Sequence, residues 1–172
     1  FIPSVKGDIP YSGDLAFDAY VQQGSARPPS VVVIHGGGGT SGSRVAHVGQ
    51  ILETLTHAGY NWFSLDYRLG GPGRFDDSLS DVRTAVAFIR CHAGELRIDA
   101  NRIVLLGEDS GAQLAGSLLT ERSPGVIGAV LSGLCVIGFG AAGNVLEGQV
   151  REAEKELESS RTSLPPPQEV QK

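Results

Sequence analysis

Residues 102–115 read Arg102-Ile-Val-Leu-Leu-Gly-Glu-Asp-Ser-Gly-Ala-Gln-Leu-Ala115 and indicate a strand, a tight turn and a helix in immediate succession. The unbroken apolar run up to Leu106 is typical of a strand that is buried on both faces of a parallel sheet. Glycines stand two positions before and two positions after Asp109, where a sharp turn favours residues without side chains. Helical spacing of apolar residues then continues to Thr120. This order predicts a nucleophile-elbow turn with Asp109 at its centre.

Strands and helices alternate on both sides of this turn. We predict further strands at residues 15–21, 30–34, 61–65 and 126–131, and helices at residues 45–57 and 77–92. The Pro- and Gly-containing residues before Leu15 are expected to be irregular. Strands that alternate with helices favour an α/β fold, with three α/β/α layers around a mostly parallel sheet.

Composition excludes several classes of function. The 172 residues carry a net charge of −5 and no basic stripe, so nucleic acid is not an expected partner. No apolar run approaches the roughly 18 residues that a membrane-spanning helix needs, so we expect a soluble protein with no membrane partner. The spacing of Cys91 and Cys135 indicates neither a metal site nor a disulfide framework. The compartment, cytoplasmic or secreted, stays open.

The composition changes after residue 143. We predict an α/β core over residues 1–143 and, over residues 144–172, a charged helix and a Pro-rich tail. The helix, from Leu146 to Arg161, is interpreted as a solvated terminal helix, with a cap or a partner-binding helix as the alternative. The sequence contains no Met and opens with Phe1, so we expect a trimmed or partial chain.

A glycine loop follows the predicted strand at residues 30–34 and reads His35-Gly36-Gly37-Gly38-Gly39. Ligands of open α/β sheets bind outside the carboxyl ends of the strands, and both this loop and the elbow lie there. Successive backbone N–H groups without side chains suit an anion or an oxyanion. The alternative is a flexible turn with no ligand.

Together with Asp66-Tyr67-Arg68-Leu69, these segments resemble the α/β-hydrolase fold. The specific resemblance is to the HGGG esterase and lipase branch related to hormone-sensitive lipase, and it covers about Leu15 to Ser132. It implies a carboxylic ester hydrolase that works by acyl transfer on a small-molecule ester, with no cofactor and no metal. It also implies an oxyanion hole at Gly36, Gly37 and Gly38, with supporting roles for His35 and Asp66.

The elbow departs from the family pattern G-x-S-x-G. Asp109 stands at the nucleophile position and Ser110 lies one residue later, so the two candidate catalytic residues are Asp109 at the elbow and Ser110 after a local rearrangement. An aspartate there resembles the dehalogenase and epoxide hydrolase branches of the fold, in which a carboxylate attacks an alkyl carbon. The same carboxylate can instead occupy the anion site itself.

The second departure concerns the rest of a catalytic triad. Residues 112–172 contain no His and no Asp, so the triad cannot be completed in the family's chain order, and the C-terminal part of the fold is expected to be missing. His57 and His92 are expected at the surface, and His47 is a weak candidate for the site. Three functions follow: a carboxylic ester hydrolase-like protein that is active or inactive as it stands, a non-catalytic ligand-binding pseudo-hydrolase, or an Asp-nucleophile hydrolase.

The predicted strand at Val126–Leu131 has no further strand after it in the sequence. An open edge on such an apolar strand promotes association. We therefore expect it to be covered by the helix at residues 146–161, by a second chain or homodimer partner, or by sequence beyond this chain.

Overall fold

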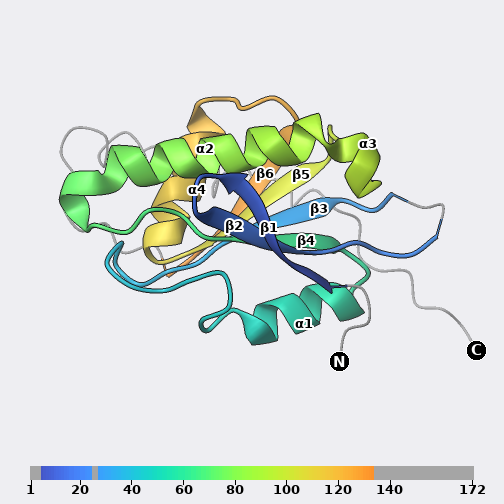
Figure 1. Cartoon of the computed structure of the whole chain (residues 1–172), viewed down its shortest axis with the longest axis horizontal. Helices are drawn as coiled ribbons and strands as arrows, with labels where there is room; N and C mark the ends of the chain where they lie inside the picture. The colour runs from blue at the N-terminus through green and yellow to red at the C-terminus, as the bar shows by residue number, and fades with distance from the viewer. Residues whose placement is uncertain (1–4, 25–26, 134–172) are drawn as a thin grey trace, which may run out of the picture. The chain divides into compact units, whose positions relative to one another are not determined.

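A six-stranded mixed sheet forms the centre of the part of the chain that the structure describes (Figure 1). The structure is a computed structural model and describes residues 5–24 and 27–133. The strand order is β1-β2-β4-β3-β5-β6, and β3, β4, β5 and β6 are parallel while β1 and β2 are antiparallel to their neighbours. The strands are β1 Val5–Ser12, β2 Leu15–Tyr20, β3 Ser30–Ile34, β4 Asn61–Leu65, β5 Ile103–Glu108 and β6 Val126–Ser132. The predicted α/β class with a mostly parallel sheet is confirmed.

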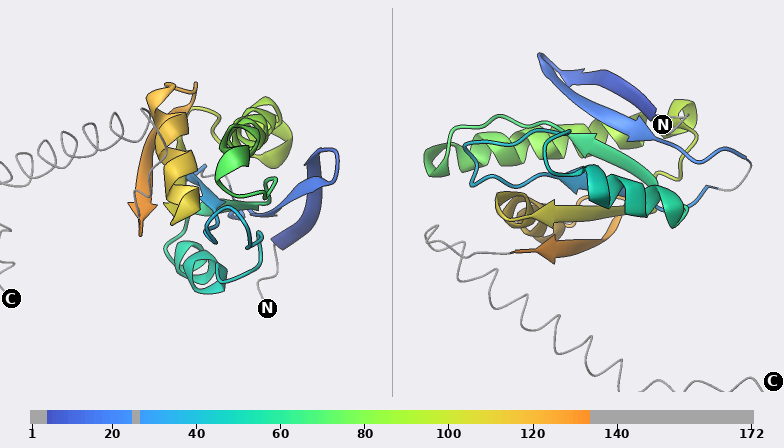
Figure 2. Two further views of the ribbon diagram at one scale, coloured as in Figure 1. Left: turned by 90° about the vertical axis from the view of Figure 1, so that its left-hand side faces the viewer. Right: turned by 90° about the horizontal axis from the view of Figure 1, so that it is seen from below.

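Helices cover both faces of this sheet (Figure 2). The helices are α1 Gly49–His57, α2 Phe75–Cys91, α3 Ala93–Leu96 and α4 Ser110–Thr120, with a short 3-10 turn at Pro72–Arg74. The larger apolar core lies on the face that α2 and α4 cover, and it contains Phe17, Phe63 and Leu105. The smaller core lies on the α1 face around Val31 and Val33. These are the three layers that the alternating pattern predicts.

Trp62 connects β4 to α1. Its indole Nε1–H donates a hydrogen bond of 2.8 Å to the hydroxyl of Thr56, and its ring stacks on Tyr20 with centroids 6.0 Å apart. The side chain is almost completely buried. The α1 face is therefore fixed by a specific contact as well as by apolar packing.

The expectation of irregular structure before Leu15 is wrong. Strand β1 pairs with β2 there, and the hairpin turns at Gly13, whose φ is 55°. Most of β1 is exposed, and only Ile9 and Tyr11 turn towards the core, so the strand has too little apolar alternation to be visible in the sequence. Pro10 is tolerated because β1 is an edge strand.

Two helix starts also differ from the prediction. Helix α1 begins at Gly49 rather than at residue 45, because His47 adopts a φ of 64°, which is incompatible with a helix. Helix α2 begins at Phe75, two residues earlier than expected, and the single turn α3 was not predicted.

Strand β6 is the last strand of the described sheet. Ala129 and Leu131 pack against the larger core, whereas Ile127 and Val130 are 60 % and 54 % exposed. The predicted boundary at residue 143, the predicted helix at residues 146–161 and Cys135 lie outside the described residues.

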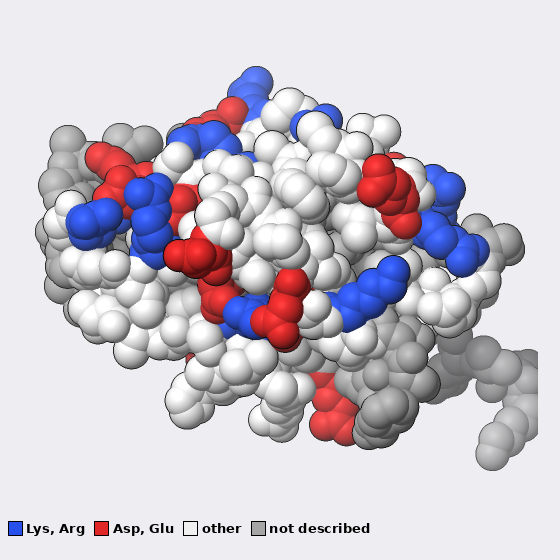
Figure 3. All heavy atoms as spheres, in the orientation of Figure 1, with Lys and Arg blue, Asp and Glu red and all other residues white. Residues whose placement is uncertain are grey.

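Acidic and basic side chains are interspersed on the face shown in Figure 3. Several are paired, such as Arg83 with Glu121 and Arg74 with Asp77. Within residues 5–24 and 27–133, no helix is long and apolar enough to cross a membrane.

Candidate functional site

The elbow is built as the glycine spacing predicts. Asp109 lies between β5 and α4 with a φ of 51° and a ψ of −115°, a conformation that side chains rarely adopt. Both flanking glycines are required by close backbone approach, because a Cβ on Gly107 would overlap the carbonyl of Gly111, and a Cβ on Gly111 would overlap the carbonyl of Ile34. The turn therefore presents the side chain of Asp109, and not that of Ser110, at its tip.

The glycine loop lies directly against the elbow. The backbone N–H groups of Gly37 and Gly38 donate hydrogen bonds to the same carboxylate oxygen of Asp109, Oδ2, at 3.2 and 2.8 Å. The hydrogen bond from Gly38 lowers the pKa of Asp109, burial opposes this, and the amides of Gly37 and Ser110 add to the lowering. The carboxylate is thus ionised at neutral pH and occupies the amides that the resemblance assigns to an oxyanion.

Gly36, the third residue of the implied oxyanion hole, contacts His35 and the backbone of the elbow instead of the Asp109 carboxylate. Its carbonyl lies 2.8 Å from Nδ1 of His35. A Cβ at this position would stand 2.9 Å from the carbonyl oxygen of Glu108, so the absence of a side chain lets the loop approach the elbow.

Ser110 holds the loop rather than occupying the tip of the elbow. It is the first residue of α4, and its hydroxyl oxygen accepts a hydrogen bond of 3.1 Å from the backbone N–H of Gly39. The same oxygen lies 3.4 Å from the hydroxyl of Tyr67. Ser110 is therefore adjacent to the site, and its contacts are those of a positioning residue.

His35 and Tyr67 support the start of the loop. The Tyr67 hydroxyl donates a hydrogen bond of 2.8 Å to the carbonyl of His35, and the two rings stack with centroids 4.4 Å apart. Burial lowers the pKa of His35, while its hydrogen bond to Gly36 and the charge of Asp66 oppose the shift. The imidazole is neutral, and because the Gly36 carbonyl can only accept, Nδ1 carries the proton.

Asp66 lies outside the immediate elbow. Its carboxylate accepts hydrogen bonds from the backbone N–H and the guanidinium of Arg44, which also contacts Asp8 and Asp18. Arg44 was not predicted, because a pairing between residues so far apart in the sequence leaves no local pattern. The next arginine of the predicted motif, Arg68, makes a bidentate pair with the buried carboxylate of Asp81, with both distances 2.8 Å.

The remaining histidines do not reach the elbow in the described part of the chain. His57 faces Glu53 on the exposed side of α1, and His92 stacks on Phe88 at the end of α2. Among the described residues, no histidine makes a hydrogen bond with the Asp109 carboxylate, which accepts its bonds from Gly37 and Gly38.

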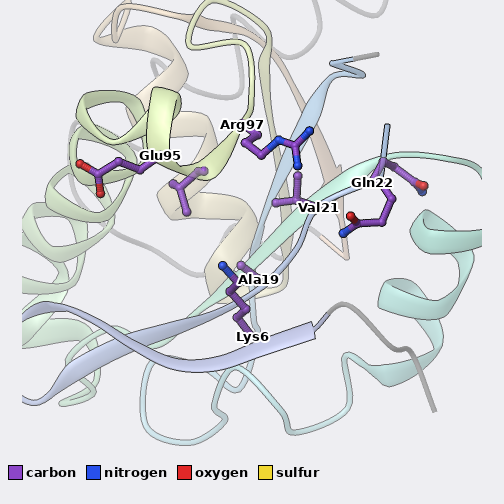
Figure 4. Close-up of a pocket in the computed structure, with 8 residues that line it drawn as sticks. Lys6, Ala19, Val21, Gln22, Glu95 and Arg97 are labelled. Atoms are coloured by element: carbon purple, nitrogen blue, oxygen red, sulfur yellow. The ribbon is translucent and has the colours of Figure 1, made fainter. Parts of the chain in front are cut away.

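A separate surface pocket lies between the β1–β2 hairpin and α3 (Figure 4). Lys6, Ala19, Val21 and Arg97 line it, and no residue of the glycine loop or elbow contributes to it. Among the residues that the structure describes, no group of three or more His, Cys, Asp or Glu side chains is arranged to hold a metal ion.

Several known proteins are similar to this chain in amino-acid sequence. A family model described as BD-FAE matches residues 17–124. Esterase LipC of Mycobacterium tuberculosis is 30 % identical over 97 residues, which are 56 % of this chain and 24 % of that protein. The probable isoprenylcysteine alpha-carbonyl methylesterase ICMEL1 of Arabidopsis thaliana is 28 % identical over 125 residues, 71 % of this chain and 26 % of that protein. The chain thus spans about a quarter of the length of these curated relatives.

Solved structures of an esterase and of an α/β hydrolase are similar to this chain in fold. The hyperthermophilic esterase of the archaeon Pyrobaculum calidifontis is 27 % identical with a TM-score of 0.66, over 76 % of this chain and 45 % of that chain. The α/β hydrolase enzyme MGS-M1, from a deep-sea metagenome library, shares the fold with a TM-score of 0.59 and 24 % identity, over 67 % of this chain and 51 % of that one.

Proposed function

Because the chain belongs to the BD-FAE family of α/β-hydrolase-type proteins, we propose that it is a carboxylic ester hydrolase-like protein with its acyl-transfer site at the elbow. The observation that carries this proposal is the convergence of the Gly37 and Gly38 amides on the side chain of residue 109. Amides in this position stabilise the oxyanion of a tetrahedral intermediate when a nucleophile at the elbow attacks an ester carbonyl. All four histidines of the chain lie in its described part and none contacts Asp109, so a general-base histidine would have to be supplied by residues other than these 172.

Asp109 makes the chain inactive in acyl transfer as it stands. At an ester carbonyl a carboxylate is a better leaving group than an alkoxide, so an adduct of Asp109 collapses back to the ester. In addition, the carboxylate accepts the hydrogen bonds of the two amides that the substrate oxygen would need as donors. The substrate class that fits the site is a small-molecule ester, as the names of the relatives also suggest.

The test is the hydrolysis of p-nitrophenyl acetate by the 172-residue chain and by its Asp109→Ser variant. We expect no turnover above background in the wild type and at least about tenfold faster hydrolysis in the variant. The gain does not require a histidine, because the serine leaves the amides free for the ester oxygen, and an oxyanion hole alone accelerates hydrolysis. No gain in Asp109→Ser would contradict the proposal. Activity in the wild type that is lost in Ser110→Ala would instead identify Ser110 as the nucleophile.

A second candidate function, attack on alkyl carbon, is favoured by one detail. Both loop amides donate to Oδ2, which leaves Oδ1 of Asp109 outside the hydrogen bonds of the loop. Oδ1 would form a bond to the alkyl carbon as the leaving group departs, and water would then cleave the resulting ester. The test is treatment with phenacyl bromide of the chain and of Asp109→Asn, in both of which the exposed thiol of Cys91 also reacts. An additional adduct in the wild type, assigned to residue 109 by peptide mass mapping and absent in Asp109→Asn, would support this candidate.

We further propose that a second copy of the chain covers the edge of β6. The exposed Ile127 and Val130 on this apolar strand support an association there. Light scattering during size-exclusion chromatography tests it, and a monomer mass at high concentration would contradict it.

A further inference from the structure

The oxyanion amides of this protein already hold an anion. An oxyanion hole serves catalysis when it is free to receive the substrate oxygen. Here the N–H groups of Gly37 and Gly38 both point at Oδ2 of Asp109, at 3.2 and 2.8 Å. The site is therefore occupied, and its ligand is the side chain of Asp109 from the same protein.

The two amides are fixed by contacts that do not involve this carboxylate. At one end of the loop, Tyr67 holds the carbonyl of His35 at 2.8 Å. At the other end, the hydroxyl of Ser110 accepts the N–H of Gly39 at 3.1 Å. Removal of the Asp109 carboxylate consequently leaves a loop that is held at both ends, with two donors directed at an empty position.

The charge at the site also favours an anion. The Asp109 carboxylate belongs to no ion pair among the described residues, so backbone amides and the N-terminus of α4 are its compensation. Donors of this kind favour a negatively charged ligand with an oxygen that can accept two hydrogen bonds. A carboxylate meets both requirements. A neutral molecule of the same shape gains less from them.

We propose that the Gly37 and Gly38 amides form a complete binding site for a small carboxylate anion, and that Asp109 closes this site as an intramolecular ligand. External carboxylates, including the acid half of a hydrolysed ester, are then excluded from the wild-type protein and admitted once the side chain is removed. The location of the site rests on the proposed function, but the inference concerns binding and not turnover.

The experiment follows the backbone amide signals of Gly37 and Gly38 by NMR in the ¹⁵N-labelled 172-residue chain. Sodium acetate is titrated against sodium chloride at constant ionic strength into the wild type, Asp109→Gly and Asp109→Ser. We expect saturable shifts of both signals in the two variants, with acetate bound at least about tenfold more tightly than in the wild type. Asp99→Gly, which removes a carboxylate from a remote turn, should behave as the wild type does.

Two results would overturn the inference. One is acetate binding at Gly37 and Gly38 of the wild type as tight as in the variants, because the site would then not be closed. The other is a lack of saturable shifts in both variants. If neither variant folds, acid titration of the wild type decides: the signals of Gly37 and Gly38 must move together as Asp109 is protonated, and their failure to do so overturns the proposal. None of these readouts depends on the ester hydrolysis that tests the proposed function.

Discussion

At the scale of single residues, Asp109 combines a strained backbone with a favourable side-chain contact. Its positive φ is costly for any residue except glycine, whereas its carboxylate gains two hydrogen bonds from the loop. The two effects act on different atoms, so substitutions can separate them.

Asp109→Gly is predicted to be more stable than Asp109→Ala by about 1 kcal/mol, since both lose the carboxylate but only glycine relieves the strain. Urea unfolding followed by circular dichroism measures the difference. The same pair at Asp99, whose φ is not positive, should give the opposite order, because glycine there only adds freedom to the unfolded chain. Equal stabilities of the two Asp109 variants would refute the prediction.

The lowered pKa of Asp109 also predicts a dependence on pH. The carboxylate is more acidic in the folded than in the unfolded state, so its stabilisation is present above the ordinary Asp range and is lost as the pH falls through the lowered value. Asp109→Asn lacks this contribution. The difference in unfolding free energy between wild type and Asp109→Asn should therefore shrink on acidification from pH 6 to pH 3, and a constant difference would speak against it.

At the scale of elements, the site depends on how the end of β3 is tied to the end of β4. Ile34 pairs with Leu65 in the sheet, the rings of Tyr67 and His35 stack, and the hydroxyl of Tyr67 donates a hydrogen bond to the carbonyl of His35. Of these contacts, the buried hydrogen bond is the one that can be removed while the ring stays in place.

Tyr67→Phe should cost about 1 to 2 kcal/mol of unfolding free energy, because it leaves the buried His35 carbonyl without its partner. Hydrogen exchange at Gly37 and Gly38 should accelerate in the same variant. Tyr60→Phe, at a 39 % exposed position, serves as the matched control with little effect. Unchanged exchange at the loop would show that Tyr67 does not hold it.

The elements also show what the sequence can and cannot predict. Strands β3 and β4 were predicted with their observed ends, because short segments rich in apolar, β-branched and aromatic residues between loops are typical of strands buried on both faces. Strand β1 was missed, since its exposed residues give no alternation. The elbow and the glycine loop were visible because close backbone approach requires glycine, whereas the hydrogen bonds between them depend on the distance between two chain segments 72 residues apart.

At the scale of the whole molecule, Arg44 joins three parts of the chain. Its guanidinium contacts Asp8 on β1, Asp18 on β2 and Asp66 after β4. Burial disfavours the charged guanidinium, but hydrogen bonds to Asp18 and Asp66 outweigh this and raise the pKa of Arg44. The antiparallel hairpin is thereby attached to the parallel part of the sheet.

Arg44→Gln is predicted to lower the unfolding free energy by about 1 to 3 kcal/mol, because three neighbouring carboxylates lose their shared cation. The loss should diminish at high salt, which screens their repulsion. Arg44→Lys should recover little of it, since one ammonium cannot reproduce the fork of donors. Arg83→Gln, which breaks an exposed pair with Glu121, is the control and should change stability by less than about 0.5 kcal/mol.

The contact between Trp62 and α1 gives this protein an optical reporter. Trp62 is the single tryptophan in the sequence, and it lies buried between the indole-bonded Thr56 and the ring of Tyr20. Its fluorescence emission is therefore expected to shift to longer wavelength when α1 separates from the sheet and water reaches the indole. Because the signal arises on the side of β4 away from α2 and α4, it distinguishes loosening of that layer from melting of the larger core.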